Sequence, residues 1–439
     1  MGPFPSDKPQ QLSDQSQSEL RSDSSLNSRS SLSSQSSLRS VPSLTPPLEH
    51  YLYPHTSTTT AHAGGASAHH HYVATIKSHS SSVFSLSLAG KHLYSGDSNG
   101  EIHVRDAHSH SPSPPSSHNN NHQPVAECRS AVKSMAISGE NLLFTAHHNH
   151  EIRVWKIDNS SAPNGPRRPP YKLIKTLPTM TDRCLGLFSS GGHVSVRRHK
   201  KSTWVRHVDA VSALALTADA TLLYSASWDR TFKVWRTSDF KCLESVQNAH
   251  DDAINAVALS GDGFAYTGSG DKRIRVWKKN GGDKKRHSLV ATLEKHRSAV
   301  NALALSADGA VLYSGACDRS IILWERDGGT AHMAVVGALR GHTKAILCLA
   351  VVSDLLCSGS ADRTVRIWRR ESGNSNSGSG NSYSCLSVFE GHNNPVKCLT
   401  ACLDINYVKS SDNSGTSYMV YSGCLDSEIK IWNLWVPIT

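Results

Sequence analysis

Short apolar runs alternate with turn residues from residue 72 to residue 439. In one unit these runs read AVSALAL (210–216), LLYSAS (222–227) and TFKVWR (231–236), and such β-branched and aromatic runs favour strands. A fourth run precedes the histidine of each unit, as LVATLEK does before His296. Four strands in a unit of about 40–45 residues are typical of a propeller blade. The pattern therefore predicts an all-β propeller.

Polar residues recur at fixed places in these units. A histidine is followed by Ser or Thr in a strand, by Asp four residues later, and by Trp six residues after the Asp. Five units carry the whole set: His207, Ser225, Asp229 and Trp235; His250, Thr267, Asp271 and Trp277; His296, Ser314, Asp318 and Trp324; His342, Ser358, Asp362 and Trp368; His392, Ser422, Asp426 and Trp432. Two earlier units keep part of it: His79, Ser95 and Asn99 with Arg105 at the Trp position, and Thr145, Asn149 and Trp155 with Arg129 near the His position.

The number of blades depends on one interval. Between Trp155 and Trp235 the chain is about twice as long as one unit, and the Ser–Asp–Trp set is missing there. Residues 178–206 are therefore either a degenerate eighth blade or an excursion of helix and hairpin attached to the second blade. The preferred prediction is seven blades, with residues 72–439 as the folded domain.

The two ends of this domain suggest how the ring closes. The last unit stops at EIKIWNLWVPIT (428–439), its third strand, and YVATIK (72–77) is a strand that precedes the first unit. Pairing the two would remove both exposed edges. We therefore expect residues 72–77 to complete the C-terminal blade.

Residues 1–71 differ from the rest because Ser, Pro, Gln and Thr dominate them. Such a segment has too little apolar surface to offset the entropy lost on ordering, so we expect a disordered tail. Serines near basic residues, as in SRSS (28–31), and Thr45 before Pro46 suit protein kinases. Phosphates there would dock the tail on a basic propeller.

The repeated units resemble WD40 repeats, and the resemblance covers residues 72–436. Two longer words, SWDRTFKVWRTSDFKCLESVQNAHDDAINAV and HVSVRRHKKSTWVRH, resemble the plant Jingubang-like family of WD-repeat proteins. This resemblance implies a plant regulatory protein, with transcription factors among its partners and restraint of pollen germination and growth as one role.

In a WD40-like blade the recurring Asp lies in a tight turn and the Ser and Trp lie on adjacent strands. The His can bridge Asp and Ser while the Trp indole N–H donates to the Ser hydroxyl. A catalytic triad is the alternative, but the Ser lies inside a strand and the set occurs in copies, whereas an active site needs one cleft. The set therefore predicts structural tetrads and a protein that is not an enzyme.

The formal net charge of the chain is +10, and residues 72–439 carry all of the excess, because the tail has a net charge of −1 and the rest +11. The words RRHKK (197–201) and KKRH (284–287) suit nuclear import, whereas direct nucleic-acid binding is not expected without interleaved aromatic residues.

No apolar run is long enough to span a membrane, and the ten cysteines include no CxxC pair. We expect a cytoplasmic and nuclear protein with reduced thiols. The histidine runs at 69–71 and 147–150 lack the spacing of a metal site, and no cofactor is predicted.

A propeller presents one face as a docking surface, and the Asp turns and His loops define such a face here. Trp228 precedes a turn Asp, and an aromatic side chain there is not needed for the fold, although it could simply pack on its neighbouring blade. A mixed-charge rim follows the His loops. The predicted partner-binding residues are Trp228, Arg297, Lys344, Asp209 and Asp251.

Two functions fit this surface. The leading one is a monomeric scaffold that binds regulatory proteins. The alternative is a substrate receptor of a cullin-type ubiquitin ligase, which is disfavoured because the repeats do not close with a Trp-Asp-x-Arg word.

Overall fold

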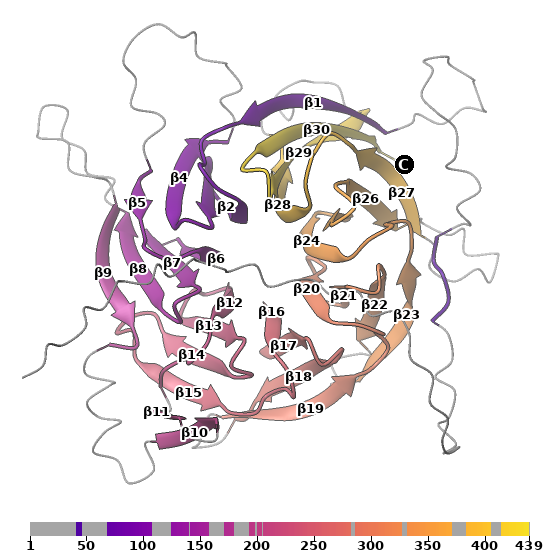
Figure 1. Cartoon of the computed structure of the whole chain (residues 1–439). Helices are drawn as coiled ribbons and strands as arrows, with labels where there is room; N and C mark the ends of the chain where they lie inside the picture. The colour runs from indigo at the N-terminus through magenta and orange to yellow at the C-terminus, as the bar shows by residue number, and fades with distance from the viewer. Residues whose placement is uncertain are drawn as a thin grey trace, which may run out of the picture. The chain divides into compact units, whose positions relative to one another are not determined.

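Seven four-stranded antiparallel sheets form a ring of blades in the computed structural model (Figure 1). The structure describes residues 41–45, 68–107, 124–139, 141–157, 171–179, 193–197, 200–203, 205–281, 286–326, 332–370, 383–404 and 414–438. The prediction of a disordered tail falls largely outside these residues. Every element described is a β-strand, so the all-β, seven-bladed prediction is confirmed.

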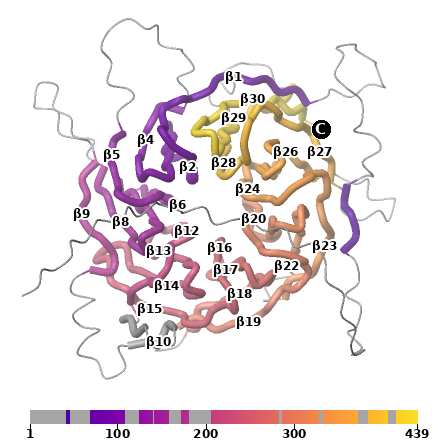
Figure 2. The backbone as a smooth tube through the Cα atoms, viewed as in Figure 1, coloured from indigo at the N-terminus to yellow at the C-terminus, as the bar shows by residue number. Residues whose placement is uncertain are grey.

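The first three blades are numbered along the chain, each from its innermost to its outermost strand (Figure 2). Blade 1 comprises β2 (Val83–Ala89), β3 (His92–Asp97), β4 (Glu101–Asp106) and β5 (Ala126–Glu127). Blade 2 comprises β6 (Val132–Ser138), β7 (Leu142–His147), β8 (Ile152–Ile157) and β9 (Tyr171–Leu177). Blade 3 comprises β12 (Val211–Leu216), β13 (Leu222–Ser227), β14 (Phe232–Arg236) and β15 (Cys242–Val246).

The remaining blades follow the same order. Blade 4 comprises β16 (Ile254–Leu259), β17 (Phe264–Ser269), β18 (Ile274–Lys279) and β19 (His287–Leu293). Blade 5 comprises β20 (Val300–Leu305), β21 (Val311–Ala316), β22 (Ile321–Arg326) and β23 (Met333–Leu339). Blade 6 comprises β24 (Ile346–Val352), β25 (Leu355–Ser360), β26 (Val365–Arg370) and β27 (Tyr383–Phe389). Blade 7 comprises β28 (Val396–Leu403), β29 (Gly415–Cys424), β30 (Ile429–Pro437) and β1 (His69–Ile76).

Within the described residues, the long interval between blades 2 and 3 contains a separate hairpin and no eighth blade. Strands β10 (His193–Arg197) and β11 (Lys200–Thr203) pair only with each other. The predicted helix of this excursion would fall on residues 180–192, which lie outside the described residues.

The ring closes through a strand from the N-terminal side of the domain. β1 pairs antiparallel with β30, with Ile76 opposite Ile429 and His69 opposite Trp435. The strand therefore starts three residues before the expected 72–77. Its histidines pack on aromatic rings, since the His70 and Phe389 centroids lie 4.8 Å apart. Both chain ends of the domain are thus tied into one sheet, in which β1 covers the outer edge of β30.

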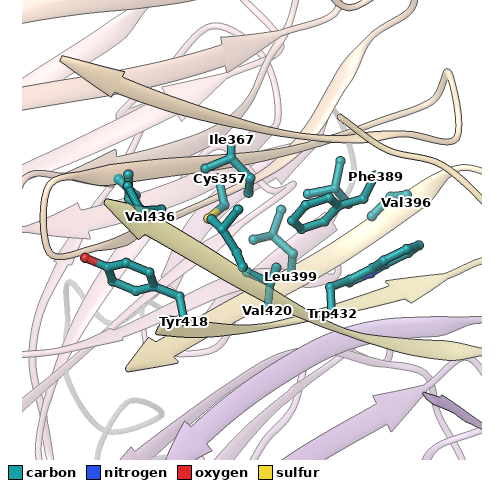
Figure 3. Packing of buried hydrophobic residues seen from close by; sticks show 12 residues of the cluster. Cys357, Ile367, Phe389, Val396, Leu399, Tyr418, Val420, Trp432 and Val436 are labelled. Carbon is teal, nitrogen blue, oxygen red and sulfur yellow. The ribbon is translucent and has the colours of Figure 1, made fainter. Parts of the chain in front are cut away.

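Neighbouring blades bury apolar side chains between their faces. Figure 3 shows the cluster between blades 6 and 7, where Cys357, Ile367 and Phe389 face Val420 and Trp432. Each fully buried side chain of this size contributes about 1.5–3 kcal/mol. Among the described residues, no helix has the length and apolar content needed to cross a bilayer.

Each innermost strand begins with a β-bulge. In blade 3 the pairing register shifts between Val211 and Ala213, so Ser212 has no partner in β13. The same shift occurs at the second residue of β2, β6, β16, β20, β24 and β28. Bulges re-aim a side chain away from the ladder. Seven side chains are thereby released from pairing beside the centre of the ring.

Closure by β1 predicts a position-dependent effect on stability. Ile76 packs against the cluster between blades 7 and 1, whereas His71 on the same strand is exposed. Ile76→Asp should lower the free energy of unfolding by about 1–3 kcal/mol, because it places a carboxylate against apolar side chains. The matched change His71→Asp should alter it by less than about 0.5 kcal/mol. Urea unfolding of the two full-length variants tests this, and equal effects would contradict closure by β1.

Candidate functional site at the centre of the ring

Four blades carry complete tetrads. In blade 5, His296 Nδ1 lies 2.9 Å from Asp318 Oδ2 and its Nε2 lies 2.8 Å from Ser314 Oγ. The indole Nε1 of Trp324 donates to the same Ser314 Oγ over 2.8 Å. Blades 3, 4 and 6 repeat this arrangement with His207, Ser225, Asp229 and Trp235; His250, Thr267, Asp271 and Trp277; and His342, Ser358, Asp362 and Trp368.

The Asp of each tetrad also holds its turn. Asp362 Oδ1 accepts the N–H of Thr364 over 3.0 Å, and Oδ2 accepts the N–H of Thr343 over 2.9 Å. Between Asp362 and Thr364, Arg363 has φ of 75°, a left-handed conformation that L-residues adopt at an energetic cost. The carboxylate therefore stabilises the turn as well as the histidine.

Burial and hydrogen bonding set the charges of these groups. Burial opposes ionisation of Asp271, but the hydrogen bond from His250 and the nearby backbone N–H groups hold its pKa at about 2. The same balance keeps the pKa of Asp229, Asp318 and Asp362 well below the usual range. Every hydroxyl in these four tetrads takes the indole N–H of a buried Trp, so none is presented as a nucleophile.

Blade 1 replaces two members of the tetrad. His79 Nε2 lies 2.7 Å from Ser95 Oγ, but its Nδ1 faces Asp97, 3.2 Å away, and not Asn99. Asp97 Oδ1 accepts the backbone N–H groups of Asn99, Gly100 and Glu101. The assignment of Asn99 as the tetrad member was therefore wrong, because a carboxylate two residues earlier performs both tasks.

Blade 2 obtains its histidine from a different element. His147, at the end of β7, lies 2.8 Å from Thr145 Oγ1, which also accepts the indole N–H of Trp155 over 3.0 Å. Burial lowers the pKa of His147 to about 4. Arg129 therefore does not stand in for the histidine of this blade, and the run at 147–150 supplies a structural side chain.

Blade 7 keeps the hydroxyl contacts. His392 Nε2 lies 2.7 Å from Ser422 Oγ, which accepts the N–H of Trp432 over 2.9 Å. Asp426 accepts the N–H groups of Asn393 and Glu428, while His392 Nδ1 is buried without a hydrogen-bond partner among the described residues. Burial lowers the pKa of His392 to about 4.

Two groups of side chains lie close enough together to share a metal ion. They are His79, Glu101 and His103 in blade 1, and His392, Cys424 and Asp426 in blade 7. Both include the tetrad histidine, which is already bonded to a serine hydroxyl. Coordination through Nε2 would compete with these bonds, whereas Nδ1 of His392 makes no hydrogen bond among the described residues.

The predicted rim residues lie in separate places. Asp251 binds Arg273, with Oδ2 2.7 Å from its Nη1, and Arg273 also binds Glu294. Asp209 accepts the N–H of Ala210 over 2.7 Å. Arg297 and Lys344 are exposed in the loops that enter blades 5 and 6. Asp209 and Asp251 are thus engaged within their own blades, whereas Arg297 and Lys344 are exposed and form no ion pair among the described residues.

Trp228 lies between blades 3 and 2. Its ring makes an edge contact with His148 at 5.8 Å, and Lys133 Nζ lies 5.3 Å from its centroid. Because 37% of the residue remains exposed, Trp228 both packs on its neighbour and presents aromatic surface. It lies beside Lys133, and no contact joins it to Arg297 or Lys344 among the described residues.

The seven residues released by the bulges form what we term the inner ring: Phe84, Lys133, Ser212, Asn255, Asn301, Leu347 and Lys397. On blades 3 to 5 the members of the inner ring form hydrogen bonds from one blade to the next. Each member donates to the backbone carbonyl that precedes the next bulge, over 2.5 Å for Ser212 to Ile254, 3.0 Å for Asn255 to Val300 and 2.8 Å for Asn301 to Ile346.

On blades 7, 1 and 2 the inner ring is basic and aromatic. Lys133 Nζ lies 4.3 Å from the centroid of Phe84, within the range of a cation–π interaction. Burial and, to a smaller extent, the positive charge of Lys397 together lower the pKa of Lys133 to about 8. Neither lysine forms an ion pair among the described residues. We call Lys397, Phe84, Lys133 and Trp228 the central site. It combines two cations with two aromatic rings.

The central site was only partly visible in the sequence. Trp228 was predicted, whereas Phe84, Lys133 and Lys397 were missed. Their signal is positional, because each follows the first buried residue of an innermost strand, as Lys133 follows Val132. The bulge that exposes that position cannot be read from strand alternation alone.

Comparison with known families agrees with this geometry. The family model "WD domain, G-beta repeat" matches residues 198–236, 240–278, 287–325, 333–369 and 383–433, which include the tetrad tryptophans of blades 3 to 7. The chain is a WD40-repeat propeller. WD40 propellers are typically non-enzymatic scaffolds for protein–protein interaction, and blades 1 and 2 extend the matched repeats to a full ring.

Curated relatives share parts of this propeller. The chain is 37% identical over 83 residues to the small ribosomal subunit protein RACK1z of Arabidopsis thaliana, covering 18% of this chain and 25% of RACK1z. It is 33% identical over 79 residues to RACK1 of Drosophila melanogaster, covering 17% and 24%. It is 32% identical over 153 residues to the human kinesin-like protein KIF21A, covering 32% and 9%. The matched part is thus a quarter or less of each of these relatives.

The tetrads of this WD40 propeller predict unequal costs for two similar substitutions in blade 6. Asp362 is part-buried and accepts bonds from His342 and Thr364, whereas Asp354 is half-exposed and binds Arg369 at the surface. Asp362→Asn should lower the free energy of unfolding by about 1–3 kcal/mol, because an amide N–H₂ meets buried donors. Asp354→Asn should cost less than about 1 kcal/mol. Denaturant titration compares them, and equal losses would refute a structural role for the tetrad carboxylate.

Buried histidines predict that acid weakens the propeller. His147 and His392 have folded-state pKa values of about 4, below the 6.5 typical of an unfolded chain. Between these values the unfolded chain binds more protons, so the free energy of unfolding should fall as pH drops from about 6.5 to 4. The tetrad carboxylates add a further loss below about pH 4. Thermal unfolding against pH measures this, and His147→Gln should flatten the slope. A midpoint that does not change between pH 7 and 4.5 would contradict it.

Proposed function

We propose that this protein is a scaffold that binds regulatory proteins by taking an acidic side chain into the central site. The observation that carries the proposal is the pair Lys133 and Lys397, two cations near enough to interact that form no ion pair among the described residues; burial and then the charge of Lys397 lower the pKa of Lys133. A buried cation without a partner is unfavourable. A partner carboxylate or phosphate would remove that penalty, so the free energy of binding concentrates there.

Aromatic surface beside the cations supports a peptide ligand. Phe84 and Trp228 flank Lys133, and the exposed part of Trp228 offers apolar contact area next to the charge. Trp and Arg are frequent anchors of protein interfaces, with charged pairs adding specificity. The ligand that fits is an acidic segment with an apolar or aromatic residue beside the acid.

The outer rim would extend this interface. Arg297 and Lys344 are exposed on the loops entering blades 5 and 6, and their charges would attract the same acidic partner. On the other side of the inner ring, Ser212, Asn255 and Asn301 each donate a hydrogen bond to the next blade and carry no charge. Binding should therefore be centred on blades 7, 1 and 2, with the rim of blades 5 and 6 contributing to the rate of association.

The resemblance to the plant Jingubang-like family extends the proposal to a biological setting. It suggests transcription factors among the partners and restraint of pollen germination and growth. A regulatory scaffold of this kind would work in the cytoplasm and, with the basic words at 197–201 and 284–287 as import signals, in the nucleus.

Affinity purification tests the central site with isosteric variants. Lys133→Met and Lys397→Met keep the length of the side chains and remove their charge. Lys278→Met is the matched control, because Lys278 on the third strand of blade 4 also makes a cation–π contact: its Nζ lies 4.9 Å from the centroid of the Phe264 ring. We expect the double variant to retain at most about a tenth of the partners recovered by wild type, the loss that about 1.4 kcal/mol produces. The control should retain them.

A second arm separates the centre from the rim. Trp228→Ala should also weaken capture, whereas Arg297→Glu/Lys344→Glu should mainly raise its dependence on salt. Full capture by a folded Lys133→Met/Lys397→Met variant would overturn the central site. Recovery of a cullin adaptor with wild type would instead favour the ubiquitin-ligase receptor.

A further inference from the structure

A short segment from the N-terminal side of the propeller lies along the outer edge of blade 5. Residues Val41–Thr45, here termed the docked segment, run parallel to β23 with Ser43 opposite Ala338. The N–H of Ala338 donates to Pro42 C=O over 2.9 Å, and the N–H of Leu44 donates to Ala338 C=O over 2.9 Å. Figure 1 shows this indigo segment beside β23 and β27. It therefore adds a short strand to an otherwise free edge.

The docked segment also reaches the next blade. The N–H of Tyr383, the first residue of β27, donates to Leu44 C=O over 3.2 Å. Val41 packs against the cluster between blades 4 and 5, and Leu44 packs against the cluster between blades 5 and 6. Two apolar anchors three residues apart thus enter two different blade interfaces.

Gly337 leaves the space that the Leu44 side chain occupies. A Cβ on Gly337 would lie 2.4 Å from Leu44 Cγ, closer than real Cβ contacts. Gly337 pairs with Leu323 on the third strand of its blade. The corresponding outer-strand residues of other blades all carry a side chain: Lys175, Glu244, Ala291 and Ser387. Blade 5 is thus the one among blades 2 to 6 that accommodates this leucine.

Hydrogen bonds define the last position of the segment. Thr45 Oγ1 donates to Arg340 C=O over 3.1 Å and accepts the N–H of Arg340 over 3.2 Å. Ser43, in contrast, is exposed and bonds within the segment. The contacts therefore select Val-x-x-Leu-Thr, with the two exposed positions 42 and 43 free to vary.

We infer that the β23 edge is a peptide-binding site, which the docked segment occupies in cis and which partners with an extended Val-x-x-Leu-Thr-like segment bind by displacing it. Strand addition at an exposed sheet edge draws affinity from main-chain hydrogen bonds and specificity from pockets for alternate side chains. The docked segment shows both features within five residues, few enough for a competitor to replace it. This site is on the outside of the ring and does not depend on the central site.

A competition measurement tests the inference with the full chain. The probe is a fluorescent peptide of residues 37–49, SLRSVPSLTPPLE, titrated by anisotropy into wild type and into Leu44→Asp. In wild type the tethered segment competes at an effective concentration on the order of millimolar. We expect the probe to bind Leu44→Asp at least about fivefold more tightly than wild type.

Control variants locate the binding on blade 5. Gly337→Val in the Leu44→Asp chain should abolish binding of the probe, whereas Ala291→Val, at the corresponding position of β19, should leave it unchanged. A probe carrying Asp in place of Leu44 should not bind. Equal affinity for wild type and Leu44→Asp, or binding that survives Gly337→Val, would overturn the inference.

Hydrogen exchange provides a readout that does not require the Gly337 variant to fold. The amide of Ala338 donates to Pro42, so Leu44→Asp should accelerate its exchange, and adding excess probe should slow it again. Unchanged exchange would show that the segment does not occupy the edge in solution. A wild-type dimer that Leu44→Asp dissociates would place the segment on a second copy and would overturn occupation in cis.

Discussion

One buried hydroxyl in each of six blades ties together the parts on which the propeller depends. In blades 2 to 7 a Ser or Thr oxygen takes the indole N–H of a Trp and lies within hydrogen-bonding distance of a His ring nitrogen. The hydroxyl is on the second strand and the Trp on the third. In most blades the His comes from the entry loop. Because these atoms are buried, any displacement leaves unpaired polar groups at roughly 1–3 kcal/mol each.

This constraint leaves the inner ring free to vary. The tetrad fixes where each innermost strand starts, and the bulge at its second residue releases one side chain from the sheet. On blades 3 to 5 these side chains bond to the next blade and lock neighbours together. On blades 7, 1 and 2 they carry charge and aromatic surface instead. The tetrads thus repeat from blade to blade, while the side chains of the inner ring differ in charge and polarity around the ring.

The repeated part of the structure could be predicted from the sequence, and the parts that break the repeat could not. The spacing of Ser225, Asp229 and Trp235, repeated along the chain, was enough to predict a propeller with seven blades preferred and an eighth left open. In blade 1 the spacing indicated the wrong residue, since Asp97 lies two residues before the position that the spacing gives for the tetrad carboxylate. In blade 2 the spacing did not locate the histidine, because His147 reaches the hydroxyl from the end of a strand.

Contacts between distant segments of the chain also could not be predicted from the repeat pattern. A Ser-rich composition predicted no contact for Val41 and Leu44, because composition does not reveal that Gly337, almost three hundred residues later in the chain, leaves room for a leucine. The charge of the central site had a similar origin. Lys133 and Lys397 are ordinary residues of two separate repeats, and only closure of the ring brings their charges close enough to interact.

The most direct test of the account is a structure of the full chain bound to a partner captured from its native tissue. The account predicts a carboxylate or phosphate of the partner within about 4 Å of Lys133 or Lys397 Nζ, with apolar contact to Trp228. A partner bound entirely to the sides of the blades, with both lysines still lacking an anion, would contradict the claim that the centre of the ring is the recognition site.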